Sequence, residues 1–241
     1  MDHTVRVEQV GKRYGNKIVL EKVDLTIERG QIYGFIGPSG AGKTTLVKML
    51  VGMETADEGT VTVLGKKMPN LRMLQEIGYM AQSDALYTEL TGEENLRFFA
   101  SLFKLNKEEQ KQRIAYAAEL VNLTPDLAKK AGAYSGGMKR RLSLAIALIQ
   151  NPQILILDEP TVGIDPELRL SIWNELFRLK NEEGKTIIVT THVMDEADRC
   201  DYLAMVREGR VLANGTPRQL TEQYGVNTLE EVFLRAGGKS K

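Results

Sequence analysis

The chain contains almost no cysteine: Cys200 is the only one among 241 residues. One cysteine excludes an internal disulfide, and such low usage is typical of proteins from a reducing compartment. Net charge is absent as well, because 32 Lys and Arg side chains balance 32 Asp and Glu side chains. Proteins that hold nucleic acid through a general basic field need an excess of positive charge. We therefore expect no nucleic-acid partner.

Long apolar runs are also missing. The longest candidates, 98–103 and 142–149, fall well short of the roughly 20 residues that a helix needs to cross a bilayer. The first residues show no basic segment followed by an apolar one, which a secretory signal would have. We therefore expect a protein that is soluble when isolated and stays inside the cell. Any membrane role would come through a partner.

Two kinds of strand pattern are present. Residues 5–7, 23–27 and 61–63 alternate between apolar and polar side chains, which is typical of an antiparallel sheet with one solvated face. Residues 154–157 and 186–190, like much of 31–37, are nearly continuous apolar runs, which is typical of parallel strands covered by helices on both faces. The sequence thus predicts an α/β fold with a mainly parallel core and an N-terminal antiparallel β-subdomain.

Helix starts predict the rest of the organisation. Thr91 and Glu94 form a capping box, and no convincing strand lies between 91 and 150, so we expect an inserted helical subdomain over approximately 82–145. Thr124 and Asp165 each precede a proline, a pattern that favours a helix start.

The C-terminal part has its own signals. A hairpin is predicted around 207–209, and capping boxes at Thr216 and Thr228 predict two short helices that end the segment 202–236. The length favours one large domain or a domain with a subdomain, so we expect a single domain over 1–236 and a flexible tail over 237–241.

A glycine-rich motif lies where an apolar strand meets a helix. Residues 37–45 match G-x-x-x-x-G-K-[ST], the P-loop pattern, in the strand and helix context that it requires. Backbone N–H groups of such a loop surround phosphate oxygens, and the helix N-terminus adds its positive end. Lys43 would reach the β- and γ-phosphates, and the Thr44 hydroxyl would ligate Mg²⁺. The expected ATP-binding residues here are Gly37, Pro38, Ser39, Gly40, Ala41, Gly42, Lys43, Thr44 and Thr45.

Two adjacent carboxylates end a second apolar strand. Asp158 and Glu159 follow 154–157, and a P-loop protein needs a strand-borne aspartate to hold Mg²⁺. Neighbouring strand residues point to opposite sides, so we expect Asp158 at the metal and Glu159 at the water that attacks the γ-phosphate. Taken alone, an acid at a strand end can equally be a cap.

A second glycine-rich segment, Ser135, Gly136 and Gly137, precedes the apolar helix 142–149. Such a segment can be a plain helix cap or a second anion-binding nest. One nucleotide does not need two nests from one chain. A second nest makes sense if it serves the nucleotide held by another copy.

With these motifs in this order, the chain resembles the ATP-binding subunit of ABC transporters over nearly its whole length. Residues 134–138, Tyr-Ser-Gly-Gly-Met, resemble the LSGGQ signature, and Asp165 lies in a segment similar to the D-loop. Gln82 resembles the Q-loop glutamine and His192 the switch histidine. Tyr14 resembles the aromatic residue that stacks on adenine, although a turn aromatic is the alternative.

The resemblance implies an ATPase. Its catalytic residues would be Glu159, His192, Lys43 and Gln82, with Mg²⁺ held by Thr44, Gln82 and Asp158. Two subunits, identical copies or homologous cassettes, would close head to tail around two ATP, with Ser135–Gly137 of each acting on the ATP bound by its partner. Closure would drive transport through a separate transmembrane permease, which places the subunit peripherally on the cytoplasmic face of the membrane.

Two positions depart from the signature pattern: Tyr134 replaces Leu and Met138 replaces Gln. The phosphate-contacting Ser and Gly residues remain, so catalysis is not put in doubt. The sequence form resembles the multidrug and antibiotic export branch, which implies export of a small, drug-like or lipid-like molecule. The alternative is a soluble, non-transport ABC ATPase that acts on nucleic acid or as a regulator. Such proteins carry long coiled-coil insertions or two cassettes, which this sequence lacks.

Overall fold

The computed structural model describes residues 3–238, which form two compact units. The first unit combines the described residues up to Met73 with those from Thr186 onward, and the second unit is Leu74–Lys185. The expected helical segment 82–145 falls within the second unit. The proposed single domain over 1–236 remains a prediction. Among the described residues, no helix is both long and apolar enough to span a bilayer.

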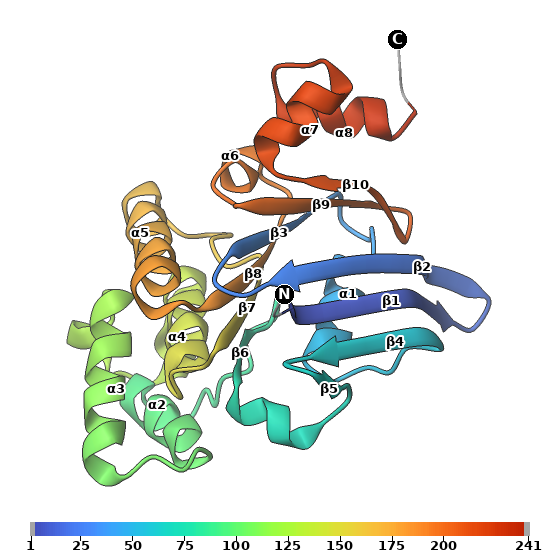
Figure 1. Ribbon diagram of the computed structural model, residues 1–241. Coiled ribbons are helices and arrows are strands. Elements are labelled where there is room, and N and C mark those ends of the chain that lie inside the picture. The colour runs from blue at the N-terminus through green and yellow to red at the C-terminus, as the bar shows by residue number, and fades with distance from the viewer. Residues whose placement is uncertain (1–2, 239–241) are drawn as a thin grey trace. The chain divides into compact units, whose positions relative to one another are not determined.

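The first unit contains the expected antiparallel sheet (Figure 1). Its strands are β1 (His3–Tyr14), β2 (Lys17–Glu28), β4 (Glu58–Val63) and β5 (Lys66–Lys67), in the order β2-β1-β4-β5. Val7 of β1 lies opposite Leu25 and Val61, and all three side chains are buried. The alternating pattern therefore predicted both the strands and the face that is buried.

Four further strands of the first unit include the parallel ones: β3 (Ile32–Ile36), β8 (Thr186–Thr191), β9 (Tyr202–Arg207) and β10 (Arg210–Gly215). β3 runs parallel to both β8 and β9, and each of its residues is buried. The predicted hairpin joins β9 and β10 through Glu208 and Gly209, which both have positive φ. Positive φ at both central residues gives a tight turn whose twist matches the strands.

Helices of the first unit are α1 (Lys43–Leu50), α6 (Met194–Ala197), α7 (Pro217–Tyr224) and α8 (Leu229–Ala236). The capping boxes at Thr216 and Thr228 are both formed, as predicted. Of the predicted tail 237–241, Gly237 and Gly238 make a turn after α8, and 239–241 lie outside the described residues.

The second unit is mainly helical. Its strands β6 (Ile77–Met80) and β7 (Ile154–Asp158) pair in parallel, and no strand is described between them. Helices α2 (Gly92–Ser101), α3 (Lys107–Leu120) and α4 (Gly136–Leu148) contact one another, and α5 (Pro166–Glu183) contacts α3. Short 3₁₀ segments are η1 (Leu71–Gln75), at the boundary between the units, η2 (Thr124–Asp126) and η3 (Ala131–Ala133).

Two expected helix starts need correction. Thr124 does not cap a helix: it lies inside η2, whose N-cap residue Leu123 makes no side-chain cap bond. This segment is a three-residue turn directly after α3, so its Thr-Pro pair shapes a turn. Helix α4 begins at Gly136 rather than near 142, because the Ser135 hydroxyl accepts a hydrogen bond from Met138 N and draws both glycines into the helix. Asp165 caps α5 as predicted.

Candidate nucleotide-binding site

The P-loop lies between β3 and α1 in the first unit. Gly42 is the N-cap residue of α1 and has φ 110°, a conformation that residues with a side chain rarely adopt. The loop turns through a hydrogen bond from Ala41 N to Pro38 O, and helix bonding begins with Leu46 N donating to Gly42 O. The buried strand β3 is therefore followed by a tight turn, and the backbone of this turn continues into α1.

The start of α1 differs from those of the other long helices. Among described helices of eight or more residues, α1 alone begins without a side-chain cap; α2, α3, α4, α5, α7 and α8 each have one. The first N–H groups of a helix need an acceptor, and its N-terminus carries a partial positive charge. A phosphate group fits both requirements.

Lys43 lies across this loop. Its side chain is buried, and Nζ donates to Gly37 O at 2.6 Å and to Pro38 O at 3.1 Å. The ammonium group is thus held beside the helix start, where it adds a full charge to the helix dipole. Thr44 and Thr45 are partly exposed on the first turn of α1. A hydroxyl on Thr44 is a donor of the oxygen type that Mg²⁺ prefers.

Tyr14 lies close to this site, at the end of β1. The residue is 45% exposed, and Lys12 Nζ lies 5.5 Å from the ring centroid. Partial burial raises the pKa of Tyr14, as does Glu54, while Thr45 and Lys12 act in the opposite direction. The interaction with Thr45 brings Tyr14 to the first turn of α1, where an exposed aromatic residue could stack on a bound base.

His192 follows β8, also in the first unit, and is exposed. The turn that carries it is fixed by Thr191, whose hydroxyl accepts from Val193 N at 3.0 Å and donates to Glu196 at 2.7 Å. The buried Thr191 hydroxyl and Glu196 carboxylate thus fix the backbone turn that holds His192.

In the second unit, Asp158 is the last residue of β7 and is fully buried. Glu159 lies outside the strand, with φ 53°. The expectation that strand alternation separates the two carboxylates is therefore corrected, because β7 ends at Asp158 and Glu159 is not a strand residue. The left-handed backbone of Glu159 itself sets the direction of its side chain. Such a conformation costs about 1 kcal/mol or more and is often found at functional sites.

The structure brings Gln82 to Glu159. Gln82 follows β6 after a gap of one residue and is exposed, and its Nε2 donates to Glu159 Oε2 at 3.3 Å. The two residues are 77 positions apart in the sequence, and the parallel pairing of β6 with β7 places them at the same strand ends. A carboxylate and an amide that share a hydrogen bond can orient one water molecule between their remaining polar atoms.

Sequence reasoning missed Arg140, on the second turn of α4. Its side chain is buried and donates to four backbone carbonyls, those of Ala81, Gln82, Asp158 and Glu159. A signal was available in the sequence. Arg140, Ser143, Leu144 and Ala147 follow the i, i+3, i+4, i+7 spacing of one helix face, so an arginine occupies a position of the buried stripe.

The signature segment opens α4. Ser135 and Gly136 are exposed, and a Cβ built on Gly136 would meet nothing within 4 Å in the described chain. A Cβ on Gly137 would lie 3.2 Å from Gly163 O, just before the D-loop residue Asp165. Tyr134 points inward: it is buried, and its hydroxyl donates to Asp126 O at 2.9 Å.

The predicted residues thus form two groups. In the first unit, Tyr14 and residues 37–45 lie together, and His192 follows β8. In the second unit, Gln82, Asp158 and Glu159 lie together, linked by Arg140, and Ser135–Gly137 begin the helix that carries this arginine.

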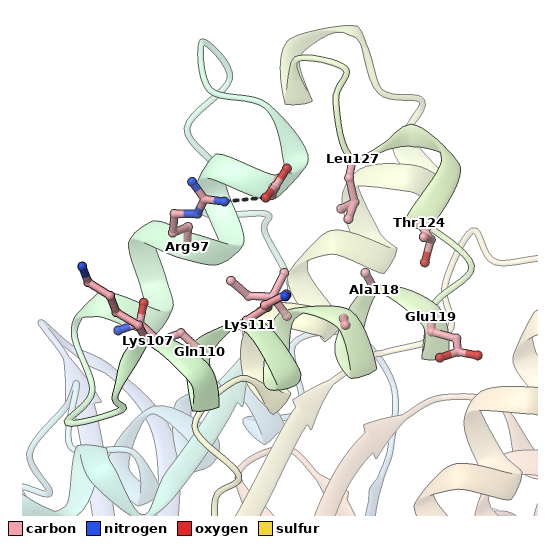
Figure 2. A pocket seen from close by; sticks show the side chains of 11 residues that line it. Arg97, Lys107, Gln110, Lys111, Ala118, Glu119, Thr124 and Leu127 are labelled. Atoms are coloured by element: carbon pink, nitrogen blue, oxygen red, sulfur yellow. Dashed lines mark hydrogen bonds and ion pairs between the residues drawn. The ribbon is translucent and has the colours of Figure 1, made fainter.

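A cavity elsewhere in the second unit contains none of these residues. It has a volume of about 930 Å³ and lies among α2, α3 and η2 (Figure 2). Ile114, Ala118 and Leu127 supply apolar surface, while the Arg97–Glu93 ion pair and lysines of α3 supply charge.

Comparison with protein families gives one match that covers most of the chain: residues 20–162 match the model described as "ABC transporter". The chain is 42% identical to Nod factor export ATP-binding protein I of Sinorhizobium fredii, over 95% of this chain and 68% of that protein. It is 40% identical to ABC transporter G family member 23 of Dictyostelium discoideum, over 96% of this chain. The chain spans only 33% of the length of this second relative.

Solved structures agree in fold. One described as the ATP-binding subunit of an ABC transporter superposes with a TM-score of 0.90 at 28% identity, over 97% of this chain and 99% of that one. An ATP-binding cassette solved as a dimer in a post-hydrolysis state, with ADP and Pi bound, gives a TM-score of 0.82 at 27% identity, over 88% of this chain and 98% of that one.

Proposed function

Because the chain belongs to the ABC transporter ATP-binding family, and is therefore an ATP-binding ATPase with the α/β P-loop fold, we propose that it drives export of a small molecule through a separate transmembrane permease. The observation that carries the ATP-binding part of the proposal is the start of α1. Lys43 lies across the P-loop there, at the one described long helix that has no side-chain cap.

ATP binding is assigned to the first unit. The N–H groups of the P-loop and of the first turn of α1 bind the phosphates, and Lys43 exchanges its loop carbonyls for phosphate oxygens. Tyr14, which is 45% exposed, stacks on adenine. His192, at the end of β8, contacts the γ-phosphate.

Hydrolysis is assigned to Glu159 with Gln82. The Glu159 carboxylate takes a proton from water as the water oxygen attacks the γ-phosphorus, and the bond from that phosphorus to the ADP oxygen breaks. Gln82 orients the same water, and its 3.3 Å hydrogen bond to Glu159 supports this pairing. The left-handed backbone of Glu159 follows directly after the end of β7 and sets the direction of its carboxylate.

The donor set fits Mg²⁺. Thr44 offers a hydroxyl, Asp158 a buried carboxylate and Gln82 an amide oxygen, all of the hard oxygen type that this ion prefers. When bound with ATP, Mg²⁺ would neutralise phosphate charge. Thr44 lies in the first unit, and Asp158 and Gln82 lie in the second. That all three ligate one Mg²⁺ stays a prediction from the sequence.

A second copy, or a homologous cassette, is proposed as the partner at the signature segment. Nothing in the described chain approaches a Cβ at Gly136, so contacts within the chain do not require a glycine there. Close approach by another molecule explains this glycine. The dimeric cassette among the similar structures supports pairing of two cassettes. We propose that the pair is head to tail, with Ser135–Gly137 of one copy contacting the ATP of the other.

The permease is proposed to dock on the second unit. Tyr87, Phe98 and Leu102 form an exposed apolar group, the α2 patch, with exposed fractions of 49%, 38% and 57%. The Tyr87 and Phe98 rings pack edge to face at 4.8 Å between centroids. Tyr87 lies only five residues after Gln82, so a permease segment on this patch can influence the site directly. Docking would place the protein on the cytoplasmic face of the membrane.

The direction and cargo are proposed from relatives. The Sinorhizobium fredii protein is described as a Nod factor export protein. By this likeness, and by its sequence form, we propose that the present chain drives export of a drug-like or lipid-like molecule.

Co-purification tests the proposal. Tagged Glu159→Gln protein, supplied with ATP and Mg²⁺, is mixed with native membranes in mild detergent, and bound proteins are identified. We expect a polytopic membrane protein in roughly equal amount. Recovery of only soluble partners or nucleic acid would favour a non-transport ATPase.

A matched pair of variants localises the contact. Leu102→Glu should lose the membrane protein, whereas Leu234→Glu on α8, at a leucine that is 51% exposed, should retain it. Equal retention by both variants would remove the α2 patch from the proposal.

A further inference from the structure

We infer that Arg140 is a positioning residue that couples the signature helix to the hydrolytic pair, so that engagement of Ser135–Gly137 by the partner's nucleotide sets Gln82 and Glu159 of the same chain. This inference rests on the proposed function. It concerns how the two sites of a dimer influence each other.

The contacts of Arg140 join three segments. Nη1 donates to Ala81 O at 2.7 Å and to Gln82 O at 3.0 Å, at the end of β6. Nη2 donates to Asp158 O and, at 2.6 Å, to Glu159 O, at the end of β7. One planar guanidinium therefore holds the backbones of Gln82 and Glu159 at a fixed separation.

Its effect is greatest at Glu159. This residue has φ 53°, and the carbonyls on both sides of its backbone N–Cα–C segment accept from the same Arg140 nitrogen. A strained conformation persists only where its surroundings determine it strongly. Loss of these two bonds would let Glu159 relax to an ordinary conformation and carry its carboxylate away from Gln82.

A second tie reinforces the first. Ser143, on the same face of α4, lies 2.9 Å through its hydroxyl from Asp84 Oδ1, and Arg140 Nη1 lies 3.9 Å from the same carboxylate oxygen. Asp84 is two residues beyond Gln82. Burial lowers the pKa of Arg140, while Asp84 and Asp158 act in the opposite direction. The nearby carboxylates thus offset part of the cost of burying the charge.

The geometry also connects α4 to the signature segment. Ser135 caps α4, and Arg140 lies five residues later on this continuous helix. A rigid helix transmits displacement of its N-terminus to the next turns. A nucleotide that pulls on Ser135 and Gly136 therefore moves the guanidinium that holds Gln82 and Glu159, and each site of a dimer reports its occupancy to the other.

Arg140→Lys tests the inference, with Arg141→Lys as the matched control. Lys retains the charge but lacks the planar fork that bridges two strand ends. Arg141 is adjacent on α4, and its Nη1 donates to the carbonyls of Val121 and Asn122. We expect Arg140→Lys to lower the ATPase kcat by roughly 10- to 100-fold, since displacements of about 1 Å have such effects. ATP affinity should stay within about twofold, because the P-loop is unchanged.

Coupling to Gln82 separates positioning from a general structural role. In a Gln82→Ala background, Arg140→Lys should lower kcat much less than in the wild type, because the residue that it positions has been removed. A similar loss of kcat in both backgrounds would overturn the inference. So would an unchanged kcat for Arg140→Lys, or a kcat, ATP affinity and melting temperature that all fall together.

Should Arg140→Lys not fold, Ser143→Ala decides, because it removes only the outer tie to Asp84. A lowered kcat at unchanged ATP affinity would support the inference, and a wild-type kcat would overturn it. Failure of the proposed function is distinguishable: in that case the wild-type protein itself would not hydrolyse ATP.

Discussion

The starts of α1 and α4 use similar glycine-rich sequences in opposite ways. At α1, no side chain caps the helix, and the buried Lys43 lies across the loop carbonyls. At α4, Ser135 caps the helix itself, and the exposed Gly136 has no chain neighbour at its Cβ position. The start of α1 lacks a side-chain cap and has a buried lysine beside it. The start of α4 is capped by its own Ser135 and is exposed to solvent.

This difference separates two kinds of anion site. A helix start with free N–H groups and a resident cation can bind phosphate within one chain. A helix start that is already capped offers surface and dipole, but it has no need of a ligand for its own stability. The second therefore suits a contact that forms and breaks, which is what a nucleotide-dependent dimer requires.

The largest expected effect is that of Glu159→Gln, which should trap a dimer that uses both helix starts. Glu159→Gln should lower the ATPase rate by about a hundredfold or more, since it removes the proposed general base. ATP binding should persist, so a dimer with ATP between α1 of one copy and α4 of the other should accumulate. Size-exclusion chromatography with ATP and Mg²⁺ measures this. A near wild-type rate would contradict the role given to Glu159.

Separate variants at α1 and α4 should affect ATP binding and ATP-dependent dimerisation independently. Lys43→Ala should weaken ATP binding by about tenfold or more, because a charge-assisted hydrogen bond to phosphate is lost. Isothermal titration measures the affinity, and Lys48→Ala in the last turn of α1 serves as the control.

Gly136→Val should leave ATP affinity within about twofold and abolish ATP-dependent dimerisation, since the added side chain projects outward. Its melting temperature should stay near that of the wild type. Weakened ATP binding by the isolated Gly136→Val monomer would break the distinction between the two helix starts.

A stability measurement tests how Tyr134, the buried residue of the signature segment, packs. A Cβ at Gly92 would lie 2.2 Å from the Tyr134 hydroxyl oxygen, so Gly92→Ala should destabilise the protein by about 1–3 kcal/mol. Tyr134→Leu, which restores the signature pattern, should reduce that loss in the double variant. Urea unfolding of all four proteins measures the coupling. Additive effects would show that Tyr134 does not occupy this space.

The smallest expected effect concerns Tyr14, beside α1. Tyr14→Ala should cost about 1 kcal/mol of ATP affinity if the ring stacks on adenine. Tyr14→Phe, which keeps the ring, should restore most of it. Equal affinity for all three proteins would assign Tyr14 a purely structural place at the end of β1.

Much of the fold followed from local patterns. Alternation predicted β1, β2 and β4, apolar runs predicted β3, β7 and β8, and capping boxes located α2, α7 and α8. These patterns succeed because burial of one face and satisfaction of the first N–H groups are decided within a few residues. Thr124 shows the limit. Its Thr-Pro pair is a local signal for a helix start, but the helical segment at this position is a 3₁₀ turn of only three residues.

The sequence by itself determined the P-loop, the acidic strand end and the signature, because each is a short run whose chemistry depends on adjacent residues. Tertiary structure alone decided that Gln82 meets Glu159 across 77 positions, that β7 ends before Glu159, and that Arg140 joins both strand ends. These features depend on which strands pair and which carbonyls a buried guanidinium reaches. No local pattern specifies such contacts, because they form only when distant segments pack.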